Sequence, residues 1–296
     1  MVGGNRLDCP DNTSSPAASL LQKKLLINST ILDAHLGARF MTMDLKDFFL
    51  ATPMARSKYM RIHSKYFPPE TKALYMIDSD GYVYVEINKG KNEFKQASVI
   101  AYQPLVKHLD GHGYYPVPFT TGIWSHQNLK TMLCICVDDF GINFFSQQDA
   151  NHLLTALRQK YDVTVEWTGE NYLGIDIGWE YQKGHVDISM PEYIPNAMIR
   201  LNHPAPKKPQ YTPHRWTTPA YGQQLQIDPY PNSSEFIDQQ GTKFIQNVVS
   251  IFLYYARALD PTMICALNEI SCVQARPTKD TMAKAKCFLD YPINHA

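Results

Sequence analysis

The segment CVDDFGINF, residues 136–144, places two adjacent carboxylates, Asp138 and Asp139, between two apolar runs. The flanking residues favour strands and Gly141 follows the acids, so residues 130–146 predict a β-hairpin whose turn presents both carboxylates. Paired acids are common in solvated turns, and the pair alone does not separate a catalytic site from an ordinary turn. Between buried strands, however, an unpaired carboxylate is costly unless a metal ion or another cation accompanies it.

A third acid, Asp44, ends a strand predicted over residues 38–44. If this strand lies beside the hairpin, Asp44 and Asp138 face each other across neighbouring strands. Clusters of carboxylate oxygens suit Mg²⁺, which keeps coordination places for phosphates. A cluster of Asp44, Asp138 and Asp139 would suit phosphoryl transfer with two Mg²⁺ ions, for which Mn²⁺ could substitute.

The surrounding pattern predicts how these acids are positioned. A helix is expected over residues 19–32, with Leu21, Leu25 and Leu32 on one apolar stripe and Lys23 toward solvent. The further predicted elements are a strand within 79–92, a helix over 95–113 that Pro104 kinks, a helix over 147–163 and a hairpin within 171–190. This order predicts an α+β fold, with an antiparallel, ferredoxin-like sheet and helices on one face.

The pattern changes near Pro191, which predicts a second domain. Residues 203–222 contain five prolines and read as an extended linker. Strong helical patterns follow over 243–271, broken at Pro261, and over roughly 278–290. We expect domains of residues 1–190 and 191–296.

Composition narrows the functional classes. The 296 residues carry 28 Lys and Arg against 28 Asp and Glu, so no broad basic surface indicates a polyanion partner. The six cysteines form no CxxC pair, which favours a reducing, intracellular setting, and no apolar run approaches the ~20 residues that cross a bilayer. His108 and His112 form an HxxxH pattern without the glutamate of a zinc protease, and Cys134 and Cys136 are most simply core residues.

The chain resembles the reverse transcriptase of copia-type LTR retrotransposons over nearly its whole length. The order and spacing of several stretches carry the resemblance: VGGNRLDCP (2–10), KLLINSTI (24–31), ARFMTMDLKDFFLATPM (38–54), GYVYVEINKG (81–90), FKQA (94–97), CVDDFG (136–141) and YLGIDI (172–177). Asp44 and Pro53 keep the family's nine-residue spacing, although Phe48 replaces the usual small residue.

The resemblance implies an RNA-directed DNA polymerase built on a polymerase palm, with partial fingers and a mostly helical thumb or connection region after residue 190. Asp44, Asp138 and Asp139 would then be its catalytic acids and metal ligands. Phe49 stands where an aromatic ring closes over the sugar and selects deoxynucleotides. Two further pairs of residues match positions of known function in the family. Lys95 and Gln96 match the element that packs against the template and the incoming base pair, and Leu173 and Gly174 match the hairpin that holds the primer.

The implied partners are an RNA or DNA template with its primer and deoxynucleoside triphosphates, with no membrane. The full element would add integrase and ribonuclease H domains, and the enzyme would work in the cytoplasm, within a virus-like particle, or in the nucleus.

Several departures from the family leave alternatives open. Asn92 and Glu93 replace the usual Tyr-Gly pair, and the chain begins downstream of the fingers strands that hold the triphosphate in the family. It ends where the connection would lead into a ribonuclease H domain, so we expect truncation at both ends. One alternative is a decayed, inactive fragment that binds nucleic acid weakly. Another is a metal-dependent phosphohydrolase that merely shares paired acids.

Overall fold

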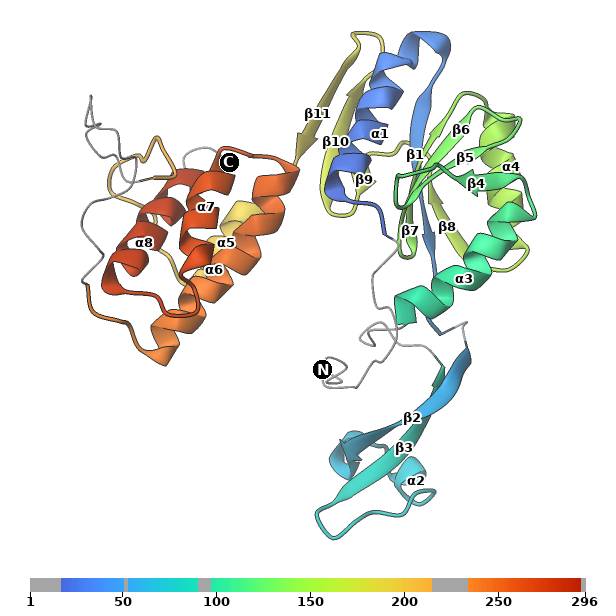
Figure 1. Ribbon diagram of the computed structural model, residues 1–296. Helices are drawn as coiled ribbons and strands as arrows, with labels where there is room; N and C mark the ends of the chain where they lie inside the picture. Colours follow the sequence, from blue (N-terminus) through green and yellow to red (C-terminus); the bar gives the residue numbers. More distant parts are fainter. Residues whose placement is uncertain (1–16, 51–52, 90–96, 215–233, 294–296) are drawn as a thin grey trace. The chain divides into compact units, whose positions relative to one another are not determined.

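The computed structural model describes residues 17–50, 53–89, 97–214 and 234–293, and the chain divides into two units (Figure 1). The first unit comprises Met1–Leu173 and Gly178–Val186, and the second comprises Gly174–Ile177 and Asp187–Ala296. The main division at Asp187 lies close to the boundary expected after residue 190.

A six-stranded sheet forms the centre of the first unit (Figure 1). Its strands are β1 (Arg39–Leu45), β4 (Tyr114–Pro116), β5 (Ile123–His126), β6 (Thr131–Cys136), β7 (Asp139–Phe144) and β8 (Val163–Glu166). They lie in the order β4-β5-β6-β7-β1-β8, and each neighbouring pair is antiparallel. The predicted α+β class with an antiparallel sheet is therefore confirmed.

Helices cover both faces of this sheet, so the expectation of helices on one face was wrong. Alternate strand residues such as Met43, Phe140 and Ile142 share a buried core with α3 (Ala97–Asp110) and α4 (Gln147–Arg158). The residues between them face the other side, where Asn143 donates a hydrogen bond to Thr30 of α1 (Leu20–Leu32) at 3.0 Å. Because side chains alternate along a strand, α1 lies opposite α3 and α4.

Helix α1 begins with a capping box in which Ser19 and Gln22 bond each other's backbone, as its sequence allows. The predicted orientation of its faces was wrong. Leu21, Leu25 and Leu32 are 67%, 56% and 73% exposed, whereas Lys23 is only 8% exposed. The buried stripe is Lys23, Leu26, Ile27, Thr30 and Ile31. Polar groups on the covering strands, Asn143 among them, give this mixed stripe its partners, which apolar periodicity does not register.

Two smaller sheets accompany the central one. Strands β2 (Pro53–His63) and β3 (Tyr82–Lys89) form an antiparallel hairpin that carries the short helices η3 (Ser64–Tyr66) and α2 (Pro69–Lys72). The sequence predicted β3 but not its partner β2. Strands β9 (Asn171–Tyr172), β10 (Ile175–Glu180) and β11 (His185–Ser189) form a three-stranded sheet where one hairpin was expected.

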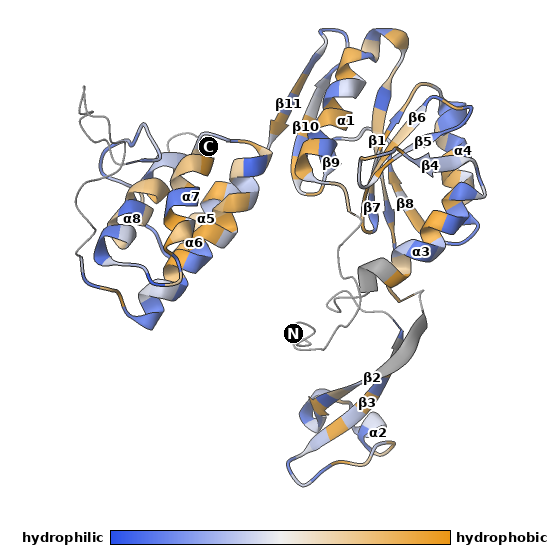
Figure 2. Ribbon diagram, in the orientation of Figure 1, coloured by the Kyte–Doolittle hydropathy of each residue, from blue (hydrophilic) through white to orange (hydrophobic). Residues whose placement is uncertain are grey.

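The second unit is helical, with α5 (Tyr193–Leu201), α6 (Gln239–Ala258), α7 (Met263–Cys272) and α8 (Lys279–Ile293). Hydrophobic residues, orange in Figure 2, run along α5 and α6, and the buried Phe252 and Phe288 meet edge to face at 5.3 Å. The predicted break at Pro261 separates α6 from α7. Among the described helices, none is long and apolar enough to cross a membrane.

Candidate functional site

The strand register brings the three predicted acids to one end of the central sheet. Asp44 of β1 lies directly opposite Asp139 of β7, and Asp139 in turn pairs with Cys136 of β6. Asp138 occupies the turn between β6 and β7, where its carbonyl accepts a hydrogen bond from the Leu45 backbone N–H at 3.0 Å. Acids that are more than ninety positions apart in the sequence therefore become neighbours through backbone pairing.

Alternation along the strands sets the direction of two of these side chains. Asp44 stands between Met43 and Leu45, which are both in the core that α3 and α4 cover, and Asp139 precedes Phe140 of the same core. Asp44 and Asp139 consequently lie on the other face of the sheet, the one that α1 partly covers.

Burial and neighbouring negative charge raise the proton affinity of Asp44 and Asp139. Burial, then the charge of Asp138 and that of Asp44, raise the pKa of Asp139 to about 6, with Lys23 opposing the rise. Burial and the charge of Asp138 also raise the pKa of Asp44, against the influence of Lys46. Mutual repulsion of this kind is typical of carboxylates that a cation would neutralise.

The turn that carries the acids has a strained backbone. Val137 has a φ of 66°, although β-branched residues rarely adopt a positive φ. Its side chain packs against the core below the sheet, which explains why an apolar residue occupies the position. A two-residue connection with positive φ at its first position is typical of a tight hairpin, so the turn holds Asp138 close to the strand ends.

A carboxylate-only donor set fits Mg²⁺ or Mn²⁺ better than softer metals, and a cation would relieve the repulsion between the acids. Within the ranges that the structure describes, however, no group of three or more His, Cys, Asp or Glu side chains is arranged to hold a metal ion. The three acids are therefore neighbours without forming a closed ligand shell in this conformation.

The predicted substrate residues lie in different settings. Phe49 is only 8% exposed and belongs to the hydrophobic core, where its ring meets that of Phe48 edge to face at 5.6 Å. Its contact with a sugar stays a prediction. Lys95 and Gln96 lie outside the described residues.

Leu173 and Gly174, the predicted primer-binding pair, form the two-residue turn between β9 and β10, with φ values of 55° and 78°. Positive φ at both positions is typical of a tight hairpin turn, which glycine adopts readily. A Cβ added to Gly174 would meet nothing within 4 Å, so its positive φ, and not crowding, is what favours glycine at this position. Its role with a primer stays a prediction.

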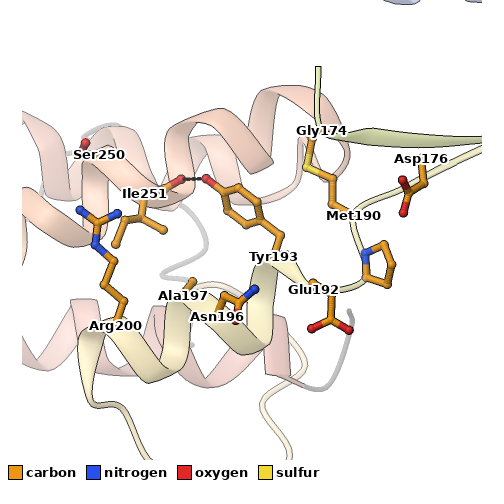
Figure 3. A pocket seen from close by; sticks show the side chains of 11 residues that line it. Gly174, Asp176, Met190, Glu192, Tyr193, Asn196, Ala197, Arg200, Ser250 and Ile251 are labelled. Carbon is orange, nitrogen blue, oxygen red and sulfur yellow. Dashed lines mark hydrogen bonds between the residues drawn. The ribbon is translucent and has the colours of Figure 1, made fainter. Parts of the chain in front are cut away.

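The second unit contains a pocket of about 450 Å³, and Gly174 is one of the residues that line it (Figure 3). Tyr193 spans it by donating a hydrogen bond from its hydroxyl to the Ile251 carbonyl at 2.6 Å. Arg200 lies toward one end, and Glu192 and Asp176 lie toward the other (Figure 3). Two carboxylates in the lining disfavour a phosphate-bearing ligand.

Two features near the acids escaped sequence reasoning. Lys23 is buried against Cys136, to whose Sγ its Nζ donates at 3.1 Å. Gly141, which the sequence suggested as part of the hairpin turn, is instead an interior residue of β7, and a Cβ there would come within 2.9 Å of the Tyr172 ring. A lysine at an apolar helix spacing and a glycine inside a strand pattern are the signals that could have indicated both.

The chain was also compared with known proteins. No protein-family model matches it, and no curated protein matches its sequence.

Proposed function

We propose that the chain is the reverse transcriptase palm of a copia-type retrotransposon, an RNA-directed DNA polymerase that adds deoxynucleotides to a primer. One observation carries the proposal: the β1–β7 register sets Asp44 opposite Asp139, with Asp138 in the adjoining turn. Three carboxylates at the end of an antiparallel sheet could supply ligands to the two divalent cations of phosphoryl transfer.

In this proposal the three carboxylates hold two Mg²⁺ ions, which would activate the primer 3′-hydroxyl and neutralise charge on the leaving pyrophosphate. Asp44 and Asp138 would be the main ligands, since one comes from β1 and the other from the β6–β7 turn and they could bind the ions from two sides. Asp139 is the third acid, and bound cations would lower its elevated pKa. The primer 3′-oxygen would bond to the α-phosphorus, the bond from that phosphorus to pyrophosphate would break, and the hydroxyl proton would pass to solvent.

In the same proposal, the other elements and predicted site residues would take the following roles. The β2–β3 hairpin would be part of the fingers, and α5 to α8 would belong to the thumb or connection region. Phe49 would select deoxynucleotides, Lys95 and Gln96 would pack against the template and incoming base pair, and Leu173 and Gly174 would hold the primer. The partners would be a primed RNA or DNA template and deoxynucleoside triphosphates.

The test is Mg²⁺-dependent incorporation of deoxynucleotides on a primed RNA template by the full chain. We expect Asp138→Asn to lower incorporation by roughly a hundredfold or more, since it removes a metal ligand. Asp110→Asn, an exposed acid at the end of α3, is the matched control and should retain activity. Equal incorporation by Asp138→Asn would contradict the catalytic assignment. Absence of activity in the unmodified chain would favour an inactive fragment.

A further inference from the structure

Lys23 of α1 is the one charged side chain that is buried among those the structure describes. It is 8% exposed, and its Nζ donates a hydrogen bond to Cys136 Sγ at 3.1 Å. Cys136 ends β6 and pairs in register with Asp139. The ammonium group is therefore fixed beside the strand that leads into the turn of the carboxylate cluster.

Burying an ammonium group costs free energy unless an opposite charge or good acceptors compensate it. A thiol is a weak acceptor, so the contact with Cys136 alone does not balance the charge of Lys23. Asp139 pairs in register with Cys136, so the contact of Lys23 with Cys136 brings its charge toward the acids at the same end of the sheet. The Lys23 charge is thus buried on the face of the sheet where Asp44 and Asp139 lie, one strand pairing away from Asp139.

We propose that Lys23 is a positioning residue that serves as the built-in counter-cation of the Asp44, Asp138 and Asp139 cluster. Without metal, its charge offsets the repulsion among the three carboxylates and keeps them at the sheet end. Once divalent cations bind, the same fixed charge repels them and weakens their binding. This inference rests on the metal site of the proposed function.

Two opposite effects of one substitution follow. Replacing Lys23 by methionine, which keeps the length and apolar stem, should tighten divalent binding and weaken the metal-free fold. A lysine that only fills space would, when replaced, change stability equally with and without metal. The comparison therefore separates an electrostatic role from packing.

The first experiment measures Mn²⁺ binding to the full chain by electron paramagnetic resonance. We expect Lys23→Met to bind Mn²⁺ roughly three- to tenfold more tightly than the unmodified chain. Lys23→Arg keeps the charge and should bind as the unmodified chain does. Lys24→Met, the neighbouring lysine on a more exposed face of α1, is the matched control and should change the affinity by less than about twofold.

The second experiment compares thermal unfolding in EDTA with unfolding in Mg²⁺. Lys23→Met should lose more stability in EDTA than in Mg²⁺. An unchanged or weaker Mn²⁺ affinity of Lys23→Met, or equal losses in both media, would overturn the role of Lys23. The variant Asp138→Asn distinguishes failure of the Lys23 role from failure of the metal site. If Asp138→Asn leaves Mn²⁺ binding intact, the carboxylate cluster is not the metal site, and both proposals fall.

Discussion

At the scale of single residues, Asp139 is the acid whose ionisation its surroundings change most clearly. Its carboxylate is half-buried. Asp139 pairs directly with Asp44 on the neighbouring strand and adjoins Asp138, so the ionised form is disfavoured. A buried carboxylate without a fully neutralising partner is typical of a site where a bound ligand supplies the missing positive charge.

This predicts an unusual pH dependence of stability in the absence of metal. The folded pKa of Asp139, about 6, exceeds the unfolded value, so the folded state binds more protons between about pH 4 and pH 6. The free energy of unfolding should therefore fall as pH rises through that window. Asp139→Asn should remove this fall and stabilise the chain at pH 7 in EDTA by about 1–2 kcal/mol, after allowance for solvent screening. Urea unfolding of both proteins in EDTA at pH 5 and pH 7 measures this difference in the free energy of unfolding. An unchanged pH dependence in Asp139→Asn would contradict a raised pKa of Asp139.

The same scale shows what a sequence can and cannot reveal about a site. The acids Asp44, Asp138 and Asp139 could be predicted because their residue types and strand contexts are local features, and the structure does bring them together. Lys23 could not, because its burial depends on which face of α1 meets the sheet. Phe49 lies in the core, a setting that its position in a motif does not reveal.

At the scale of elements, α1 provides a direct check of the corrected helix orientation. Leu26 is 2% exposed beneath the sheet, whereas its neighbour Leu25 is 56% exposed. Leu26→Ala should therefore lower the free energy of unfolding by about 2–4 kcal/mol, because it opens a cavity in the core. Leu25→Ala should cost less than about 1 kcal/mol. Urea denaturation compares the two, and equal losses would favour the orientation first expected from the leucine stripe.

A second element-scale feature is a histidine cluster where α4 meets β4 and β5. His152 Nδ1 bonds the Tyr114 hydroxyl at 3.1 Å, and its ring lies 5.1 Å from that of His126. Burial, then the charges of His126 and His112, lower the pKa of His152. This group is therefore neutral in the folded chain where an exposed histidine would already be protonated.

The effect of His152 on the pH dependence of stability is opposite in sign to that of Asp139. Because the folded pKa of His152 lies below the unfolded value of about 6.5, the unfolded chain binds more protons under that pH, and stability falls as pH drops through it. Between pH 7.5 and pH 5.5, His152→Gln should lose less stability than the unmodified chain. His35→Gln, at an exposed histidine, should behave like the unmodified chain. A larger loss in His152→Gln would contradict the prediction.

Elements whose signals are local were predictable. The helix that became α4, the hairpin of β6 and β7, and the break at Pro261 follow from apolar periodicity and turn residues. The pairing of β2 with β3 was missed because β2 includes Arg61 and His63 and lacks simple alternation. The placement of helices on both faces depends on contacts between distant segments, which periodicity within one element does not encode.

At the scale of the whole molecule, the α+β class with an antiparallel sheet and the helical second unit agree with the sequence analysis. The assignment to a polymerase remains a proposal that rests on three carboxylates and on the order of the quoted motifs. Its central claim is spatial: one divalent cation site draws ligands from β1 and from the β6–β7 turn.

The most direct test of that claim is cleavage of the full chain by Fe²⁺ with ascorbate and peroxide, because hydroxyl radicals cut the backbone next to bound iron. We predict cuts near both Asp44 and Asp138, suppressed by excess Mg²⁺ and lost in Asp138→Asn. Cuts at neither segment, or at only one of them, would contradict a shared metal site.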